Sequence, residues 1–198
     1  MNYLDIWFAI TGDRLPADHN YRLYSAVIDA IPEAKTLEWQ LHTVCGKPDH
    51  KGWIYLNEKS RMGIRCQLGS VSLFSALEDK VLQIGMSFCR LGTLTGTAIK
   101  PHRNLVSRIV TIKSHFCPVN EFEFGVSLGK QLHELGLQWM PILGARKALR
   151  VKGRDIVGYS LRFEALPEDF SLSLQASGLG GRRRMGCGVF VGGEQDNG

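Results

Sequence analysis

The first part of the chain changes from one spacing of apolar residues to another. Every second position from Leu4 to Ile10 is apolar, which places these side chains on one face of a β-strand. From Asp18, which can cap a helix, the apolar spacing lengthens to three and four residues, and Pro32 ends this pattern. The spacing therefore predicts a strand and then a helix that ends near Ile31.

The segments after this helix again show the two-residue spacing of strands and the longer spacing of helices. Residues 52–57, GWIYLN, and residues 61–68, RMGIRCQL, are typical of two strands joined by a polar turn. A short helix is predicted for residues 70–79, and a single strand for residues 81–91. The resulting order, β-α-β-β-α-β, is that of a ferredoxin-like fold.

The second half predicts the same order of elements. A strand over residues 105–113 precedes a helix over residues 120–136, with Asn120 as a candidate cap. A hairpin with its turn at Gly153 follows the helix. The last helix and the last strand are predicted within residues 167–191.

The two halves together predict an α+β fold class, with tandem ferredoxin-like (RRM-like) βαββαβ folds and a C-terminal glycine-rich loop. We place the N-terminal domain at residues 1–98 and the C-terminal domain at residues 105–193. A chain of 198 residues with 44% hydrophobic content can bury two small cores. The halves share no residue-level repeat, so the duplication is one of topology.

Composition favours a cytoplasmic protein without a metal or another cofactor. No apolar run reaches the roughly 18 residues that a membrane span requires, and the first residues lack the apolar core of a signal peptide. The five cysteines are odd in number and form no C-x-x-C pair. We therefore expect reduced thiols, no zinc site and no contact with a membrane.

Positive charge is concentrated late in the chain. The net charge is +5, and residues 144–184 carry nine basic against four acidic side chains. A basic hairpin can bind the phosphates of a nucleic acid, or it can be a solvated edge that uses charge to avoid aggregation. The candidate phosphate-binding residues of this hairpin are Arg146, Lys147, Arg150, Lys152 and Arg154.

A glycine-rich loop surrounds three consecutive arginines near the C-terminus. Glycine permits positive φ and close backbone approach, so such a loop can turn several N–H groups toward an anion. The Walker and Rossmann patterns are both absent, because the glycines here follow a helix and precede a strand. The candidate residues are Gly178, Gly180, Gly181, Arg182, Arg183, Arg184, Gly186 and Gly188.

These residues carry a resemblance to a known family. The segments GLGGRRRMGCGVF, ITGDRLPADHNYRLYSAVIDAI and WQLHTVCGKPDHKGWIYL resemble the CRISPR repeat-processing endoribonucleases of the repeat-associated mysterious protein superfamily. The resemblance covers nearly the whole chain. It implies two ferredoxin-like folds and a metal-independent cleavage of precursor CRISPR RNA, in which the 2′-hydroxyl attacks to leave a 2′,3′-cyclic phosphate and a 5′-hydroxyl.

The resemblance also implies a catalytic histidine ahead of a glycine, which selects His42, and a lysine shortly after it, which selects Lys47. A tyrosine is expected from the first helix, but Ile28 stands at that position and Tyr24 lies one turn earlier. Tyr24 is therefore the third candidate, with packing in the core as its alternative role. The other histidines to compare with His42 are His19 and His50 nearby, and His102, His115 and His133 in the second half.

The sequence leaves other functions open. The resemblance implies CRISPR repeat RNA and crRNA as partners, and other subunits of a Cascade-like effector or a CRISPR-associated transposition complex as further ones. In such a complex the chain could be a guide-RNA-binding subunit that does not cleave. A general RNA-recognition module is disfavoured because its aromatic strand motif is missing, and a metal nuclease because no carboxylates pair at ligand spacing.

Overall fold

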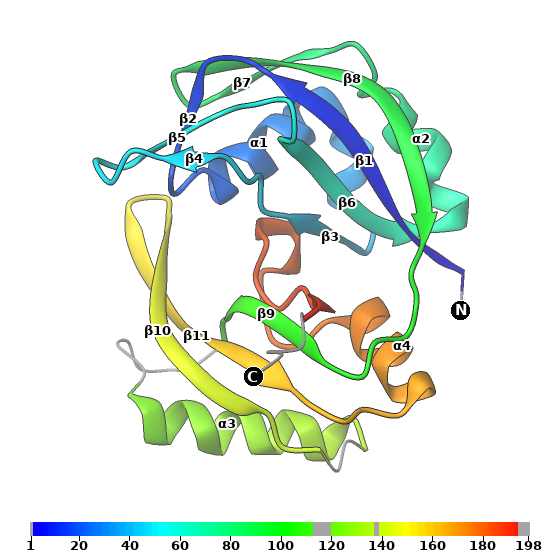
Figure 1. Cartoon of the computed structure of the whole chain (residues 1–198), viewed down its shortest axis with the longest axis vertical. Coiled ribbons are helices and arrows are strands. Elements are labelled where there is room, and N and C mark those ends of the chain that lie inside the picture. The colour runs from blue at the N-terminus through cyan, green and yellow to red at the C-terminus, as the bar shows by residue number, and fades with distance from the viewer. Residues whose placement is uncertain (1, 113–119, 137–138, 194–198) are drawn as a thin grey trace. The chain divides into compact units, whose positions relative to one another are not determined.

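The computed structural model describes residues 2–112, 120–136 and 139–193. The chain divides into two compact units, Asn2–Ala98 and Ile99–Gly198, which are described separately (Figure 1). No helix within the described ranges combines the length and the apolar character that a membrane span needs.

The first unit is a five-stranded antiparallel sheet with the strand order β3-β6-β1-β8-β7. The edge strand β7 aside, this is the order of a ferredoxin-like sheet. Its strands are β1 (Tyr3–Thr11), β3 (Trp39–His42), β6 (Arg61–Gln67), β7 (Val81–Ile84) and β8 (Ser87–Ala98). Its helices are α1 (Asn20–Ala30), α2 (Val71–Ser75) and the short 3-10 turns η1 (Pro32–Lys35) and η2 (Leu68–Ser70).

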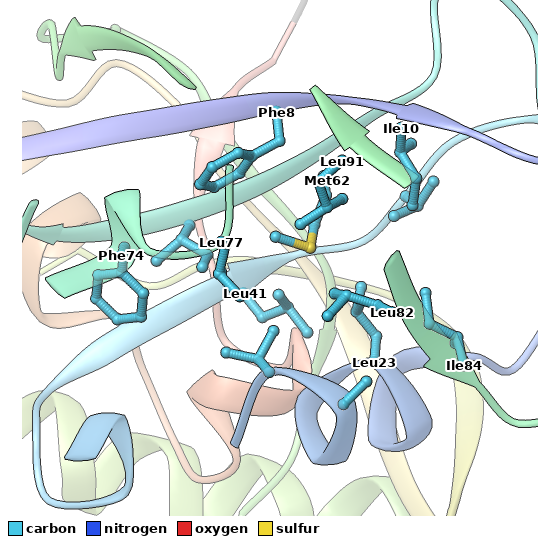
Figure 2. Close-up of a cluster of buried hydrophobic side chains, with 14 of the residues drawn as sticks. Phe8, Ile10, Leu23, Leu41, Met62, Phe74, Leu77, Leu82, Ile84 and Leu91 are labelled. Carbon is cyan, nitrogen blue, oxygen red and sulfur yellow. The ribbon is translucent and has the colours of Figure 1, made fainter. Parts of the chain in front are cut away.

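The core of this unit lies on one face of the sheet. Ile6, Phe8 and Ile10 of β1 are buried, which confirms the predicted alternation, and they belong to one apolar cluster with Leu23 of α1. Figure 2 shows Phe8, Ile10 and Leu23 with side chains of the neighbouring strands and with Phe74 of α2. The opposite face of β1 and β6 is therefore the one that carries polar side chains.

Two predictions for this unit were wrong in detail. The single strand expected over residues 81–91 is a hairpin, because Gly85 adopts a φ of +68° between β7 and β8. The second strand of the ferredoxin-like fold is β3. Residues 52–57, which the sequence predicts as that strand, belong to a different sheet. That small sheet has the order β2-β5-β4, formed by β2 (Arg14–Pro16), β4 (Lys47–Pro48) and β5 (Trp53–Tyr55).

The second unit has a four-stranded antiparallel sheet with the order β10-β11-β9-β12. Its elements are β9 (Leu105–Val110), α3 (Glu121–Glu134), β10 (Ile142–Val151), β11 (Arg154–Phe163), α4 (Glu168–Ser177), η3 (Arg183–Met185) and β12 (Val191–Gly192). The expected cap is confirmed, since the Asn120 side chain accepts a hydrogen bond from the backbone N–H of Glu123 at 2.8 Å. The last strand is shorter than predicted. Lys113, His115 and Cys117 lie outside the described residues.

The hairpin turn at Gly153 is also confirmed. Val151 pairs with Arg154, so the turn consists of two residues, and Lys152 and Gly153 have φ values of +50° and +79°. Positive φ at both positions is what a type I′ turn requires, and its twist matches that of the two strands. The basic hairpin therefore joins β10 and β11 by a tight turn, its register shifts between Leu143 and Arg146, and β11 also pairs with β9.

Candidate functional site

His42 is the last residue of β3, and the strand register places it in one row with two other residues. His42 lies opposite Gly63 of β6, which in turn lies opposite Trp7 of β1. A Cβ at Gly63 would collide with the Trp7 ring, so the missing side chain leaves room for the indole to lie across β6. The rings of Trp7 and His42 are 4.7 Å apart between centroids, with an interplanar angle of 36°. The indole thus holds one side of the imidazole.

The next row on the same face provides a carboxylate. Asp5 of β1 lies opposite Arg65 of β6. The Asp5 Oδ1 atom accepts hydrogen bonds from His42 Nε2 at 2.9 Å and from Arg65 Nε at 2.7 Å. Its Oδ2 atom accepts from Arg65 Nη2 at 2.8 Å. Asp5 is therefore held by a bidentate guanidinium and bridges it to the imidazole.

The electrostatics of this cluster keep Asp5 ionised. Burial alone would raise the pKa of this carboxyl, but the hydrogen bonds from His42 and Arg65 and their charges lower it from 3.8 to about 2. The Arg65 side chain is 1% exposed and that of Asp5 15%. A charge pair with so little solvent contact is stable only when its hydrogen bonds are satisfied, as they are here.

An ionised carboxylate fixes the tautomer of His42. Since a carboxylate can only accept, the Nε2 atom of His42 carries the hydrogen that Asp5 receives. Nδ1 is then the ring nitrogen that can accept a proton from a substrate and later return it. Among the described residues, Nδ1 has no hydrogen-bond partner. The arrangement of carboxylate and imidazole is that of a general base oriented by an acid residue.

The other two candidates for catalysis lie in different surroundings. Lys47 is exposed at the start of β4, five residues after His42. Tyr24 of α1 stacks on Trp39, with ring centroids 6.1 Å apart, and packs against the apolar core. Because Trp39 and His42 are three residues apart on β3, their side chains point to opposite faces of the sheet. The structure therefore does not bring Tyr24 to His42, and a catalytic role for Tyr24 stays a prediction.

The two neighbouring histidines differ from His42. His19 is buried, its Nδ1 atom lies 2.9 Å from the Pro16 carbonyl oxygen, and its Nε2 atom accepts from the Val44 backbone N–H. Both ring nitrogens of His19 thus form hydrogen bonds with the backbone, which is a structural role. His50 is exposed in a loop with a φ of +59°. His102 and His133 are exposed in the second unit.

The glycine-rich loop is folded tightly against β9. The backbone N–H groups of Gly181 and Gly188 donate to the carbonyls of Thr111 and Ile109, both at 2.8 Å. A Cβ at Gly188 would collide with the carbonyl oxygen of Leu179, whose own N–H donates to Gly188. These glycines therefore allow close backbone crossings, and several of the N–H groups expected to face an anion are used within the fold.

The three arginines of the loop are not equivalent. Arg183 Nη1 donates to the Ser177 carbonyl oxygen at 2.5 Å, so this guanidinium caps the C-terminus of α4. Arg182 has a φ of +60°, and its side chain has no partner among the described residues. Binding of RNA by Arg182, Arg183 and Arg184 stays a prediction, for which Arg182 is the strongest candidate of the three.

In the basic hairpin, four of the five predicted residues are exposed and Lys147 is half-buried. Arg146 and Arg150 of β10 share a face, because they are four residues apart on one strand. Arg150 Nε donates to Asp155 Oδ1 at 3.0 Å, and both side chains are more than half exposed. A solvated pair of this kind contributes little to stability and can exchange for a phosphate. RNA binding by the hairpin also stays a prediction.

Comparison with known proteins gives a consistent set of relatives. The family model described as Cas6 CRISPR matches residues 4–195. A CRISPR-associated endonuclease Cas6 from Myxococcus xanthus is 30% identical over 192 residues, which are 96% of this chain and 82% of that protein.

Solved structures share the fold at lower identity. A CRISPR-associated protein Cas6 has a TM-score of 0.72 at 17% identity, covering 97% of this chain and all of that one. A Cas6-related protein from Pyrococcus furiosus has a TM-score of 0.68 at 15% identity, with 98% and 100% covered. A CRISPR endoribonuclease Cse3 bound to a 19-nucleotide RNA has a TM-score of 0.54 at 12% identity, with 96% of each chain covered.

The Asp5 cluster predicts a specific loss of stability in acid. Because the pKa of Asp5 is about 2 in the folded chain and near 3.8 unfolded, the unfolded chain takes up the proton first as the pH falls. This contribution of about 2 kcal/mol is complete above about pH 5 and is lost progressively as the pH falls through 3.8 toward 2. Urea unfolding of the wild type and of Asp5→Asn at pH 7, 4 and 2.5 measures it. The difference between the two proteins should shrink below pH 4, and a constant difference would contradict the prediction.

Proposed function

Because the chain belongs to the Cas6 family, whose model spans residues 4–195, we propose that it is a metal-independent endoribonuclease that cleaves CRISPR repeat RNA. Its products are guide crRNAs, which it releases from a precursor transcript. The observation that carries this proposal is the hydrogen bond between His42 Nε2 and an ionised Asp5, which leaves Nδ1 as the proton acceptor.

The proposed reaction needs only the chain, the RNA and solvent water. The ribose 2′-hydroxyl loses its proton to His42 Nδ1 and attacks the adjacent phosphorus, and the bond from phosphorus to the 5′-oxygen breaks. The leaving 5′-oxygen takes up a proton from water and His42 returns its proton to the solvent, so the products are a 2′,3′-cyclic phosphate and a 5′-hydroxyl. Asp5 and Arg65 act as positioning residues. Asp5 contacts the His42 imidazole, Arg65 contacts the Asp5 carboxylate, and neither contacts the RNA in this reaction.

Lys47 is the candidate for the positive charge at the phosphate. A cation near the nonbridging oxygens stabilises the negative charge that develops during the attack. Lys47 is exposed and has no partner among the described residues, so its ammonium group is available to an anion. Its ammonium group is carried on a flexible stem that begins five residues after His42.

The exposure of His42, only 6%, gives a specific reason to consider a chain that binds RNA without cleaving it. A buried imidazole can stabilise a carboxylate as a purely structural partner. In that case the chain would hold guide RNA through the hairpin and the glycine-rich loop. The following prediction separates the two functions.

For His42→Ala we expect single-turnover cleavage of a repeat RNA to fall by about 100-fold or more, because a proton-transfer group is lost. The RNA dissociation constant should change little. His50→Ala, an exposed histidine of the same unit, is the matched control and should cleave like the wild type. If wild-type protein binds the RNA tightly but leaves it intact, the chain is a carrier and the proposed function is wrong.

For Asp5→Asn we expect the cleavage rate at saturating protein to fall by about tenfold or more, because an amide holds the imidazole and its tautomer less firmly than a carboxylate does. The RNA dissociation constant should stay within a factor of about two, since Asp5 does not contact RNA in the proposed reaction. The cleavage rate at saturating protein and the RNA dissociation constant are measured for both proteins at pH 7. Circular dichroism at the same pH checks that the variant is folded. An equal loss of both would assign Asp5 a structural role only.

The loop arginines should separate into a binding residue and a structural one. Arg182→Gly keeps the left-handed backbone and should lower the slope of log affinity against log salt by about 0.7 to 0.9, the value of one phosphate contact. Arg183→Ala should instead lower the free energy of unfolding by about 1 kcal/mol, because the end of α4 loses its cap. Salt titrations and urea unfolding of both variants test this. An unchanged slope for Arg182→Gly would mean that this side chain faces solvent in the complex.

A further inference from the structure

The small sheet β2-β5-β4 presents one ordered row of side chains across its three strands. Tyr55 of β5 lies opposite Arg14 of β2 on one side and opposite Lys47 of β4 on the other. Directly opposed residues of antiparallel strands point to the same face of a sheet. Trp53, two residues before Tyr55, shares this face, which is called the aromatic-cation face below.

The two faces of this sheet have opposite character. Leu15 of β2 is fully buried, and Ile54 of β5 packs against the apolar core of the first unit. On the aromatic-cation face, Arg14, Lys47 and Tyr55 are exposed and Trp53 is half-buried. Figure 1 shows β2, β4 and β5 together at one side of the first unit. The sheet is thus anchored through its inner face, and its outer face is open to a ligand.

Local contacts hold the outer face in one arrangement. The Arg14 guanidinium lies over the Trp53 ring, 4.4 Å from its centroid. Asp49 Oδ1 accepts from the backbone N–H groups of Lys51 at 2.7 Å and Trp53 at 3.0 Å, so this carboxylate holds the turn between β4 and β5. The ion pair of Arg14 with Asp13, at 3.8 Å, is exposed and weak. The cations of the face therefore remain available to an anion.

The combination of rings and cations identifies the class of ligand. Proteins that bind single-stranded nucleic acid place aromatic rings for the bases to stack on and basic side chains along the backbone. Tyr55 is 39% exposed, and its hydroxyl has no partner among the described residues. The Tyr55 ring lies between Arg14 on one neighbouring strand and Lys47 on the other. This order matches a base stacked on the ring, with the phosphates before and after that base at the two cations.

The position of the face along the chain connects it to the candidate active site. Lys47 lies five positions after His42, and extended chain covers this separation in at most about 18 Å. A nucleotide bound on the aromatic-cation face would therefore lie within a few nucleotides of a phosphate at His42. We propose that this face binds the single-stranded RNA next to the cleavage site, with a base stacked on Tyr55, a flanking phosphate at Arg14 and the scissile phosphate itself at Lys47. This inference rests on the proposed function, since it assumes that RNA lies at His42.

The test compares the binding of matched RNAs to the full chain by fluorescence anisotropy. The first RNA carries single-stranded flanks on both sides of the scissile phosphate, and two others lack the 5′ or the 3′ flank. All carry a 2′-deoxyribose at the scissile position, which prevents cleavage by 2′-hydroxyl attack. Tyr55→Thr removes the ring but keeps a residue that suits a strand. Phe88→Thr is the matched control, because Phe88 is an exposed aromatic residue on β8 of the same unit.

We expect Tyr55→Thr to weaken binding of the flanked RNA by about 5-fold or more, the loss of one stacked base. Against the RNA that lacks the bound flank, Tyr55→Thr and wild type should bind alike, which also shows which flank occupies the face. Tyr55→Phe should keep the wild-type affinity, since stacking needs the ring and not the hydroxyl. Arg14→Gln should lower the salt slope for the flanked RNA by about 0.7.

Two results with Tyr55→Thr, and one with the control variant, would overturn the inference. One is an unchanged affinity of Tyr55→Thr for the flanked RNA, and the other is an equal loss for flanked and trimmed RNAs, which would reflect a change in the fold. A loss for Phe88→Thr equal to that of Tyr55→Thr would likewise show that the effect is not specific. The proposed function is tested separately, by cleavage of the all-ribose flanked RNA with wild-type protein. That cleavage can fail while the dependence on Tyr55 persists, and the reverse also holds.

Discussion

The first unit depends on one half-buried carboxylate, that of Asp5, and on the charge that neutralises it. Asp5 stands in the middle of a sheet, where an ionised group without partners would strongly destabilise the fold. Arg65 supplies two parallel hydrogen bonds from the adjacent strand, and His42 supplies a third from the strand beyond it. A slip of one residue in the pairing of β1 with β6 would move Arg65 to the opposite face. The same contacts that set the register therefore set the orientation of the imidazole.

The fold could be predicted where apolar residues repeat over a long window. The alternation in β1, the helix that Asn120 caps and the turn at Gly153 all follow from local chemistry, and the structure confirms them. The strand β3 was missed because it has only four residues, all of them buried, so its polar members Gln40 and His42 do not mark a solvent face. A window of four residues gives too few repeats to distinguish a strand from a loop.

The candidate site could be predicted only in part. His42 and Lys47 follow from a resemblance, whereas Asp5 looks like the ordinary polar side of a half-buried strand. The only local signal was an acidic residue in one strand and an arginine, Arg65, inside another apolar strand. Their pairing depends on register, which the sequence does not state. The glycine-rich loop was found by composition, but that its N–H groups bond to β9 depends on tertiary contacts.

Gly63 links the identities of two other positions. The indole of Trp7 occupies the space that a side chain at residue 63 would need, and that indole lies against His42. A larger residue at position 63 is compatible with this sheet only if position 7 becomes smaller at the same time. Positions 7 and 63 should therefore vary as a pair among functional variants of this chain. In a library that randomises one of the two positions alone, the imidazole would lose the ring that fixes its plane.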